Sequence, residues 1–294
     1  MTPVALLIAA NVASAAPDRR ADAHLFDVQL DVLQKGFAPE GLVIEPVRWS
    51  GPDIDWTRFA AVLVNCAWDY QDRHEDFLTT LDRIAARGVP VFNSPATVRW
   101  NIRKTYLREM ASLGVPIIPT MWPDRPAALD IREAFIAFGT NDVVLKRQVG
   151  GGARAQVRYS KGDAPPGDEI MDRPGMIQPL IPSIMTEGEY SFLFVDGEFS
   201  HALIKRAKAG DYRIQEAYGG ASLAIAPAPA DTRAARTTLD VLKETPLYAR
   251  VDMVRADDGR LLLMELEVIE PYLYPIDGPG IGAMLGKALR RRLG

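Results

Sequence analysis

Three acidic residues near the end of the chain have a spacing that could hold a metal ion. Glu265 and Glu267 lie two residues apart in the apolar run LLLMELEVIEP, and Asp252 lies in the apolar run YARVDMV before it. The ADDG segment between the runs is typical of a hairpin turn. A two-residue loop at its Asp-Gly pair would place Asp252 opposite Glu265, about 5 Å apart, and Glu267 would share their face. A three- or five-residue loop would shift this register.

Three carboxylates on one face of a hairpin repel each other unless a cation lies among them. Hard oxygen ligands of this kind suit Mg²⁺ or Mn²⁺, so Asp252, Glu265 and Glu267 are candidate metal ligands. The alternative is that Arg250, which faces Glu267 in the same register, neutralises the acids as an ordinary ion pair. The hairpin alone leaves both possibilities open.

A glycine loop follows a lysine that lies in an expected strand. Lys146 belongs to the strand candidate DVVLKR, and Gly150, Gly151 and Gly152 follow it. Glycine lets backbone N–H groups approach an anion closely, so this combination suits nucleotide phosphates. The loop lacks the GKS or GKT of a P-loop, and a plain flexible hairpin loop is the alternative.

Further candidates lie at predicted strand ends. Asp69 and Tyr70 follow the strand candidate AVLVNCA, at the edge where parallel sheets bind ligands. The alternative is that Asp69 only caps a helix. Lys205 and Arg206 end a returning strand, and an arginine there could clamp a phosphoryl group or a developing oxyanion, or make a surface ion pair. Cys66 and the three histidines show neither nucleophile nor metal-ligand spacing.

The composition fits a soluble globular protein with a substantial core. The 294 residues are 48% apolar and 24% charged, with a formal net charge of −4. No basic face or Lys/Arg-rich tract indicates nucleic acid binding, and the RRR at 290–292 is expected to complement the dipole at the end of the closing helix. No apolar run reaches the roughly 18–20 residues needed to cross a membrane. The single Cys66 excludes an intrachain disulfide and fits the cytoplasm. The apolar N-terminus lacks the basic leader of a signal peptide and is expected to form a buried strand.

The pattern of apolar runs predicts an α/β protein. Residues 3–100 alternate between strands and helices, as in a doubly wound parallel sheet. The strands there are expected at 4–10, 42–47, 61–66 and 89–92, and the helices at 20–36 and 73–87. Beyond them we expect a helix from Ser94 through about 113, a helix at 130–138, strands at 142–147 and 155–160, an apolar connector at 176–182, hairpins at 189–207 and around ADDG, a helix ending near 242 and a closing helix.

The order of these features resembles the ATP-grasp superfamily from about Asn93 to the C-terminus. NSP at 93–95 with Lys104, DYRIQEAYGG and MELEVIEP resemble motifs of the glutathione synthetase branch. Glu267 stands where that branch usually has asparagine, and Ser191 where many relatives have arginine. The resemblance implies an ATP-grasp fold, in which an N-terminal doubly wound lobe precedes two α+β lobes that sandwich the nucleotide. The expected ranges are 1–100, 101–177 with the glycine lid, and 178–294 with the metal site.

The resemblance also implies roles for the matching residues. The ATP-binding residues would be Lys104, Lys146, Gly150, Gly151, Gly152, Gln178, Leu180, Ile181 and Glu189. Asp252, Glu265 and Glu267 would bind Mg²⁺ or Mn²⁺, while Arg206 and Lys146 would stabilise the transferred phosphoryl group. We place the acceptor pocket at Asp69, Tyr70, Arg213, Tyr218, Gly219 and Gly220.

Within the superfamily, WDY together with RWNIRKTYL and the short chain is most similar to the cycloserine synthetases. The resemblance implies an ATP-dependent ligase of antibiotic biosynthesis that activates a small amino acid carboxylate as an acyl phosphate. Its reaction would cyclise O-ureido-D-serine to D-cycloserine. The alternatives are an intermolecular carboxylate–amine ligase, making a dipeptide or a glutathione-like product, and a non-enzymatic nucleotide-binding module. The family commonly forms dimers or tetramers.

Overall fold

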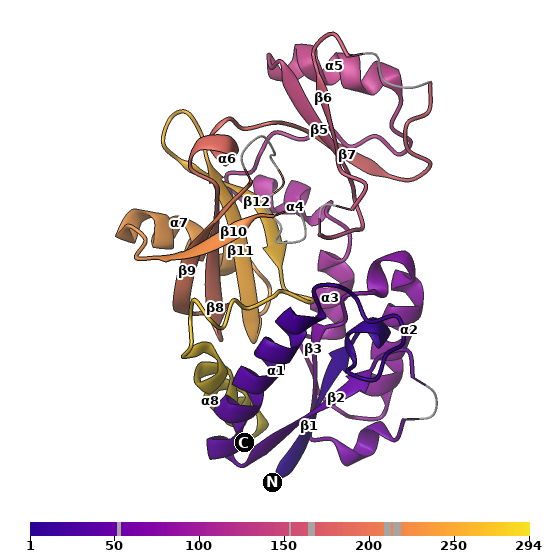
Figure 1. The fold of residues 1–294 in the computed structure, drawn as a ribbon, viewed down its shortest axis with the longest axis vertical. Helices are drawn as coiled ribbons and strands as arrows, with labels where there is room; N and C mark the ends of the chain where they lie inside the picture. The colour runs from indigo at the N-terminus through magenta and orange to yellow at the C-terminus, as the bar shows by residue number, and fades with distance from the viewer. Residues whose placement is uncertain (52–53, 153, 164–167, 209–212, 214–218) are drawn as a thin grey trace.

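The chain folds around three sheets that follow one another along the longest axis of the molecule (Figure 1). The computed structural model describes residues 1–51, 54–152, 154–163, 168–208, 213 and 219–294. The strands are β1 (Thr2–Ile8), β2 (Leu42–Arg48), β3 (Ala61–Cys66), β4 (Val91–Phe92), β5 (Asp142–Arg147), β6 (Val157–Ser160), β7 (Gly175–Pro179), β8 (Glu189–Val195), β9 (Glu198–Arg206), β10 (Ala221–Ile225), β11 (Tyr248–Arg255) and β12 (Leu261–Glu267). The helices are α1 (Ala23–Phe37), α2 (His74–Ala86), α3 (Pro95–Asn101), α4 (Tyr106–Ser112), α5 (Ala128–Phe138), α6 (Ser183–Thr186), α7 (Pro229–Asp240) and α8 (Ile281–Leu293).

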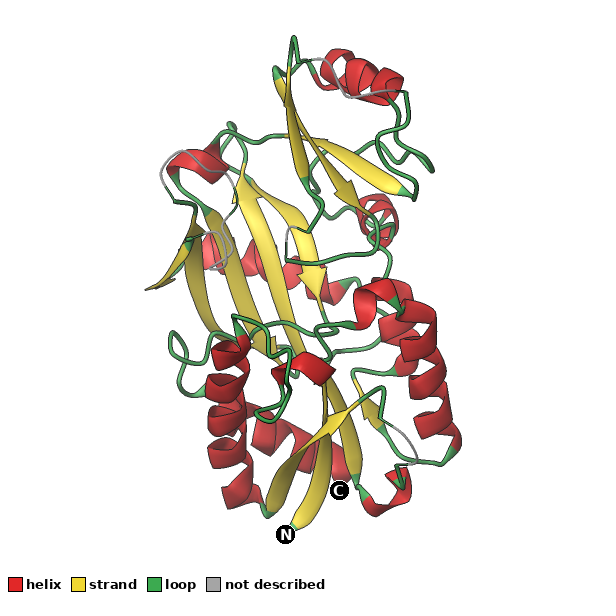
Figure 2. Ribbon diagram, turned by 45° about the vertical axis from the view of Figure 1, so that its right-hand side comes forward, coloured by secondary structure: helices red, strands yellow, loops and turns green. Residues whose placement is uncertain are grey.

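The first lobe is the predicted doubly wound unit. Its four strands are parallel and have the order β2-β1-β3-β4. Helices α1 and α2 lie on either side of the sheet, as Figures 1 and 2 show. The apolar residues of β1 and β3 are buried between these helices, which is why both strands read as nearly continuous apolar runs.

The second and third lobes contain antiparallel sheets. The sheet of the second lobe, at the top of Figure 1, has the order β6-β5-β7 and packs against α5. The segment expected as a connector is instead strand β7, in which Gln178 pairs with Val144 of β5. Its proline closes the strand and therefore interrupts no ladder. The third sheet has the order β10-β9-β8-β11-β12, with α7 packed against β11 and β12. No helix among the described residues is both long and apolar enough to span a membrane.

The β11–β12 hairpin has the predicted register but a different turn. Asp252 pairs with Glu265, as expected. The predicted two-residue Asp-Gly loop is wrong, because Ala256 donates its N–H to the carbonyl of Arg260 at 2.8 Å and closes a three-residue turn. Met264 forms a one-residue bulge that shifts the pairing back by one position. The register shift caused by the longer turn is therefore reversed by the bulge, and Asp252 still faces Glu265.

The predicted long helix after Ser94 is broken in two. Ser94 caps α3 by accepting a hydrogen bond from the N–H of Thr97 at 3.1 Å. The helix ends at Asn101, whose side chain donates to the carbonyl of Leu266 at 2.9 Å. Lys104 lies in the interruption before α4, and its N–H donates to the carbonyl of Gln148 at 2.8 Å. The break therefore places Lys104 beside the glycine loop rather than on a solvated helix.

Helix α8 returns from the third lobe and packs against α1 of the first. The two helices touch through glycines, which allow their backbones to approach closely. A Cβ atom added at Gly36 would lie 2.1 Å from the carbonyl carbon of Gly282, and one added at Gly282 would lie 2.3 Å from the carbonyl oxygen of Val32. The crossing therefore requires both glycines.

Replacing Gly282 with alanine is expected to destabilise the protein by about 1–3 kcal/mol, because the added methyl group overpacks a backbone contact. The matched control is Gly280→Ala, since an added Cβ at Gly280 meets no atom within 4 Å. Urea unfolding of both variants measures the difference. Equal stability of the two variants would show that the helices can separate without cost.

Candidate active site

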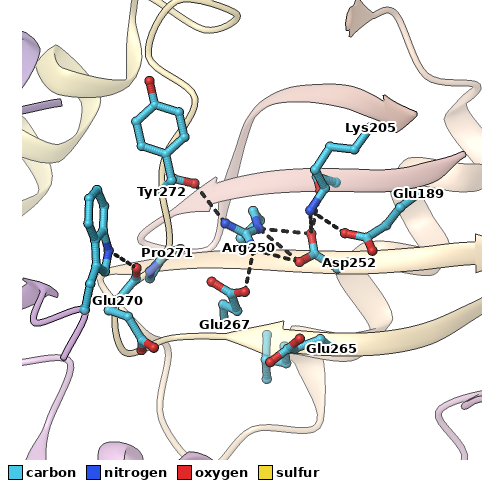
Figure 3. A network of polar contacts seen from close by, with 12 residues as sticks. Glu189, Lys205, Arg250, Asp252, Glu265, Glu267, Glu270, Pro271 and Tyr272 are labelled. Atoms are coloured by element: carbon cyan, nitrogen blue, oxygen red, sulfur yellow. Dashed lines mark hydrogen bonds and ion pairs between the residues drawn. The ribbon is translucent and has the colours of Figure 1, made fainter. Parts of the chain in front are cut away.

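One face of the five-stranded sheet, called here the charged face, gathers side chains from four neighbouring strands (Figure 3). Successive side chains of a strand point to opposite faces, so polar and apolar positions alternate here. The opposite face carries Tyr190, Phe192 and Phe194, which pack in the core with residues of α7. The residues of the charged face are Glu189, Ser191, Lys205, Arg250, Asp252, Glu265 and Glu267.

Asp252 is the centre of the buried charges. Arg250 donates to its two oxygens from Nε at 3.0 Å and from Nη2 at 2.9 Å. Lys205 Nζ lies 3.3 Å from Asp252 Oδ1 and also pairs with Glu189. Burial by itself would raise the pKa of Asp252, but Arg250 and Lys205 outweigh it and lower that pKa to about 2. Burial raises the pKa of Glu189 to about 7.

Each acid of the predicted metal site has a cationic partner. Arg250 pairs with Glu267 as well as with Asp252, and Lys104 Nζ lies 2.7 Å from Glu265 Oε1. Within the described residues, no group of three or more acidic, histidine or cysteine side chains is arranged to hold a metal ion. Arg250 thus neutralises both Asp252 and Glu267, which is the alternative to metal binding that the sequence left open.

The two predicted phosphate-binding lysines both lie beside this face. Lys146 Nζ donates to Gln178 Oε1 at 3.0 Å, and Gln178 donates in turn to Thr120 Oγ1 at 3.0 Å. Burial lowers the pKa of Lys146. Burial also acts to lower the pKa of Lys104, but the Glu265 carboxylate prevails and raises it.

The glycine loop bridges the second lobe and the first lobe. Arg147 before the loop and Arg154 after it lie 3.6 and 3.3 Å from the carboxylate of Asp72. Gly151 lies against Gln71, because a Cβ added there would be 3.0 Å from Gln71 Nε2. Lys104 also donates from Nζ to the carbonyl of Gly150. The loop therefore lies across the junction of the lobes.

An apolar cluster adjoins the charged face. Leu180 and Ile181, the predicted adenine-lining residues, are partly buried and pack against its buried members, which are Ile118, Ile184 and Val254. Leu262 and Met264 pack against the same residues from β12. Such a wall suits a flat aromatic ring.

Arg206 is not part of the charged face. Its exposed side chain donates from Nε to the carbonyl of Glu187 at 3.0 Å. Lys205, its neighbour, faces Glu189 and Asp252 instead. The structure therefore corrects the prediction for Arg206, and it brings in two cations, Lys205 and Arg250, that were not assigned to the site.

The predicted acceptor residues fall into three groups. Asp69 accepts hydrogen bonds from Trp49 Nε1 at 2.5 Å and from the N–H of Ala10 at 3.0 Å, so both of its oxygens are used within the first lobe. Tyr70 is buried and contacts Glu270, described below. Tyr218 lies outside the described residues. The flanking positions Arg213, Gly219 and Gly220 are described, and their assignment to the acceptor stays a prediction.

Comparison with known proteins agrees with this geometry. Residues 4–93 match the family model of the N-terminal domain of D-cycloserine synthetase DcsG. The chain is 29% identical to the cycloserine biosynthesis protein DcsG of Streptomyces lavendulae, over 91% of this chain and 94% of that protein. It is 32% identical to glutathione synthetase of Prochlorococcus marinus (strain MIT 9313), over 70% of this chain and 67% of that protein. The crystal structure of D-cycloserine synthetase DcsG superimposes with a TM-score of 0.84 at 25% identity, covering 99% of this chain and 100% of that one.

The chain belongs to the glutathione synthetase-like ATP-grasp ligases. The predicted α/β ATP-grasp fold is thereby confirmed, as is ligase chemistry that forms a C–N bond. Cys66 is buried, and burial raises the pKa of its thiol to about 12, which disfavours the thiolate that a nucleophile requires.

Two of the three predicted metal ligands, Glu265 and Glu267, are suited to bind Mg²⁺, and Asp252 is not. Mg²⁺ is usually bound by one or two carboxylates together with phosphate oxygens and water. The side chains of Glu265 and Glu267 are 28% and 23% exposed, so their oxygens can be reached. Asp252 is only 3% exposed, and its oxygens are taken by Arg250, Ser191 and Lys205. Asp252 therefore fits the role of fixing Arg250 better than that of a ligand.

Glu270, in the segment that leaves β12, is a site residue that the sequence analysis missed. Its carboxylate accepts a hydrogen bond from Gln71 Nε2 at 3.3 Å, and its carbonyl accepts one from Trp68 Nε1 at 2.8 Å. Burial, with the nearby Glu267 charge, raises the pKa of Glu270 to about 8. Two acids three residues apart after a strand were a signal that this position could have been included.

Glu270→Gln is expected to stabilise the ligase, and increasingly so as pH rises. The pKa of Glu270 is about 8 in the folded protein, against an ordinary value of 4.5. Between these values the folded state binds a proton that the unfolded state has released, so the stability of the unmodified ligase falls as pH rises. Urea unfolding at pH about 5.5 and about 8.5 checks this. A variant advantage that does not grow with pH would contradict the raised pKa.

Proposed function

We propose that this ligase uses ATP and Mg²⁺ to convert the carboxylate of O-ureido-D-serine to an acyl phosphate and then closes the ring of D-cycloserine. The observation that carries the proposal is the end-to-end similarity to DcsG, at 29% identity over 91% of the chain. The arrangement of lysines, an arginine and acids on the charged face supports the ATP-dependent step. ATP as cosubstrate and a buried, reduced Cys66 also favour the cytoplasm.

The charges of the site suit phosphoryl transfer to a carboxylate. A carboxylate resists nucleophilic attack, and phosphorylation removes its charge and supplies a leaving group. Glu265 and Glu267 would hold Mg²⁺, and the bound ion would neutralise negative charge on the ATP phosphates. Lys104 and Lys146 would contact the phosphates from the side of the glycine loop. The apolar wall at Leu180 would hold the adenine ring.

Arg250, rather than Arg206, is the arginine that we propose for the transferred phosphoryl group. Its guanidinium is held by Asp252 and by Glu267, and its Nη1 donates to the carbonyl of Tyr272 at 3.1 Å. A cation fixed in this way can stabilise developing charge without reorganising. The charge remains available, because burial of the guanidinium is outweighed by Asp252 and the pKa of Arg250 is raised.

The glycine loop would protect the acyl phosphate from water. An acyl phosphate hydrolyses easily, so ring closure must be faster than access of water. The ion pairs of Arg147 and Arg154 with Asp72 hold the loop across the junction of the lobes. Inside the closed site, the substrate's own ureido nitrogen attacks the acyl phosphate, so that phosphate leaves and the ring closes with the carbamoyl group still attached. Hydrolysis of that carbamoyl group by one water then releases carbon dioxide and ammonia.

The purified ligase is expected to release phosphate from ATP when O-ureido-D-serine and Mg²⁺ are both present. The product should have the mass of D-cycloserine and contain no added amine. Glu265→Gln should abolish turnover, because it removes a charged Mg²⁺ ligand, while the circular dichroism spectrum stays unchanged. Glu75→Gln is the matched control, since that side chain is 79% exposed. Full activity of Glu265→Gln would remove the metal assignment.

A second candidate is an intermolecular carboxylate–amine ligase. The 32% identity to glutathione synthetase over 70% of the chain supports it. Mass spectrometry separates the two reactions, because a conjugate contains the mass of a second amine and a cyclised product does not. The predicted dimer or tetramer stays a prediction, and light scattering would test it.

Arg250→Lys is expected to lower kcat about 100-fold or more, because lysine keeps the charge but loses the paired hydrogen bonds that orient it. The control is Arg206→Lys, which changes the same residue type on the opposite face of the sheet and should alter kcat by less than about threefold. Phosphate release measures both, with thermal unfolding to confirm that each variant is folded. Similar losses in the two variants would refute the assignment of Arg250.

A further inference from the structure

The acids at the site differ in whether a cation neutralises them. Lysines or arginines form ion pairs with the four acids Glu189, Asp252, Glu265 and Glu267. Glu270 is the exception, because among the described residues no lysine or arginine forms an ion pair with it. Its side-chain partners are the amide of Gln71 and the phenol of Tyr70, both neutral.

In Figure 3, dashed lines join Arg250 and Lys205 to the acids around them. Lys104 contributes only a weaker, more distant charge to Glu270, since its ammonium group is bound to Glu265. Without a cation beside it, Glu270 keeps its proton up to its raised pKa of about 8. A cationic group of a ligand would supply the missing counter-charge and favour the ionised carboxylate, so this position can accept a cation from outside the chain.

Glu270 also lies at the meeting point of the three lobes. It follows β12 of the third lobe, it accepts a hydrogen bond from Gln71 of the first, and the glycine loop of the second passes beside it. A Cβ atom added at Gly151 would lie 3.0 Å from Gln71 Nε2 and 3.9 Å from Glu270 Oε1. A ligand group bound to this carboxylate would be enclosed by the loop together with the phosphates.

We propose that Glu270, oriented by Gln71 and Tyr70, binds the ammonium group of the amino acid substrate. The proposal rests on the proposed function, in which a substrate carboxylate is phosphorylated. In an α-amino acid the ammonium and the carboxylate share one carbon, so the ammonium site must adjoin the place where the phosphoryl group arrives. Glu270 satisfies this requirement, because the charge of Glu267, a proposed Mg²⁺ ligand, acts on its carboxylate and Gly151 of the glycine loop lies beside it. A carboxylate–ammonium hydrogen bond is charge-assisted and therefore strong.

The test combines Glu270→Gln with a substrate that lacks the amino group, 3-(ureidooxy)propanoic acid. Phosphate release is measured for both proteins with this analogue and with O-ureido-D-serine. We expect each single change to lower kcat/KM by about 100-fold, mainly through KM in the case of the variant. The two changes together should cost little more than either alone, because they remove the same contact.

Two controls separate substrate binding from a structural role. Glu75→Gln should behave as the unmodified ligase with both substrates, and Glu270→Gln should bind ATP with Mg²⁺ within about threefold of the unmodified affinity, as measured by calorimetry. A KM for O-ureido-D-serine that is unchanged in Glu270→Gln overturns the inference. Losses that simply multiply in the combined case also overturn it, because Glu270 would then act on something other than the ammonium group.

Failure of the proposed function gives a different result. If the unmodified ligase does not turn over O-ureido-D-serine, the cyclo-ligase proposal falls whatever the variant does. The role of Glu270 is then judged with whichever amino acid stimulates ATP hydrolysis, compared with its counterpart that lacks the amino group. It falls if no amino acid stimulates hydrolysis, or if the two counterparts are used equally well.

Discussion

The buried guanidinium of Arg250 is the interaction on which the site depends. It lies between Asp252 and Glu267, in the middle of a sheet face where acids would otherwise repel each other. Removing one member of such a group leaves an uncompensated buried charge, which typically costs about 3–5 kcal/mol. The charged face can therefore hold so many ionised groups only because lysines 104 and 205 and this arginine distribute positive charge among them.

Hydrogen bonds, an ion pair and one helix contact join the three lobes near the charged face. Asn93, at the end of the first lobe, donates to the carbonyls of Tyr248 and Val268 at 2.9 and 2.7 Å, so β11 and the end of β12 are tied to it. Lys104 connects the glycine loop to Glu265, and α8 returns to pack on α1. Because these contacts converge near the charged face, a movement between lobes changes the surroundings of the acids and the loop together.

The fold was largely predictable, but side-chain direction in the two hairpins was not. In the β11–β12 hairpin a longer turn and a bulge cancel, so Asp252 faces Glu265 for a reason that differs from the one assumed. In the β8–β9 hairpin, unbroken pairing from the tight turn would put Arg206 on the face of Glu189. One extra residue, Ser200, shifts the pairing, and Lys205 takes that place. A bulge leaves no clear pattern in a sequence, because both neighbouring registers bury similar apolar residues.

What the sequence did not predict at the site depends on partners far away in the chain. Lys104 was predicted as an ATP-binding residue but was expected on a continuous helix, and its N–H donates instead to the carbonyl of Gln148 where the helix is interrupted. Glu270 looks like any acid before a proline until Gln71 and the glycine loop are found beside it. The spacing of apolar residues along the chain predicts which helices and strands form. Which acid pairs with which cation in a buried site depends on residues from all the lobes that enclose it. Within the part of the chain that the structure describes, the other four acids of the site each have a lysine or arginine partner and Glu270 has none, so Glu270 is informative about the ligand.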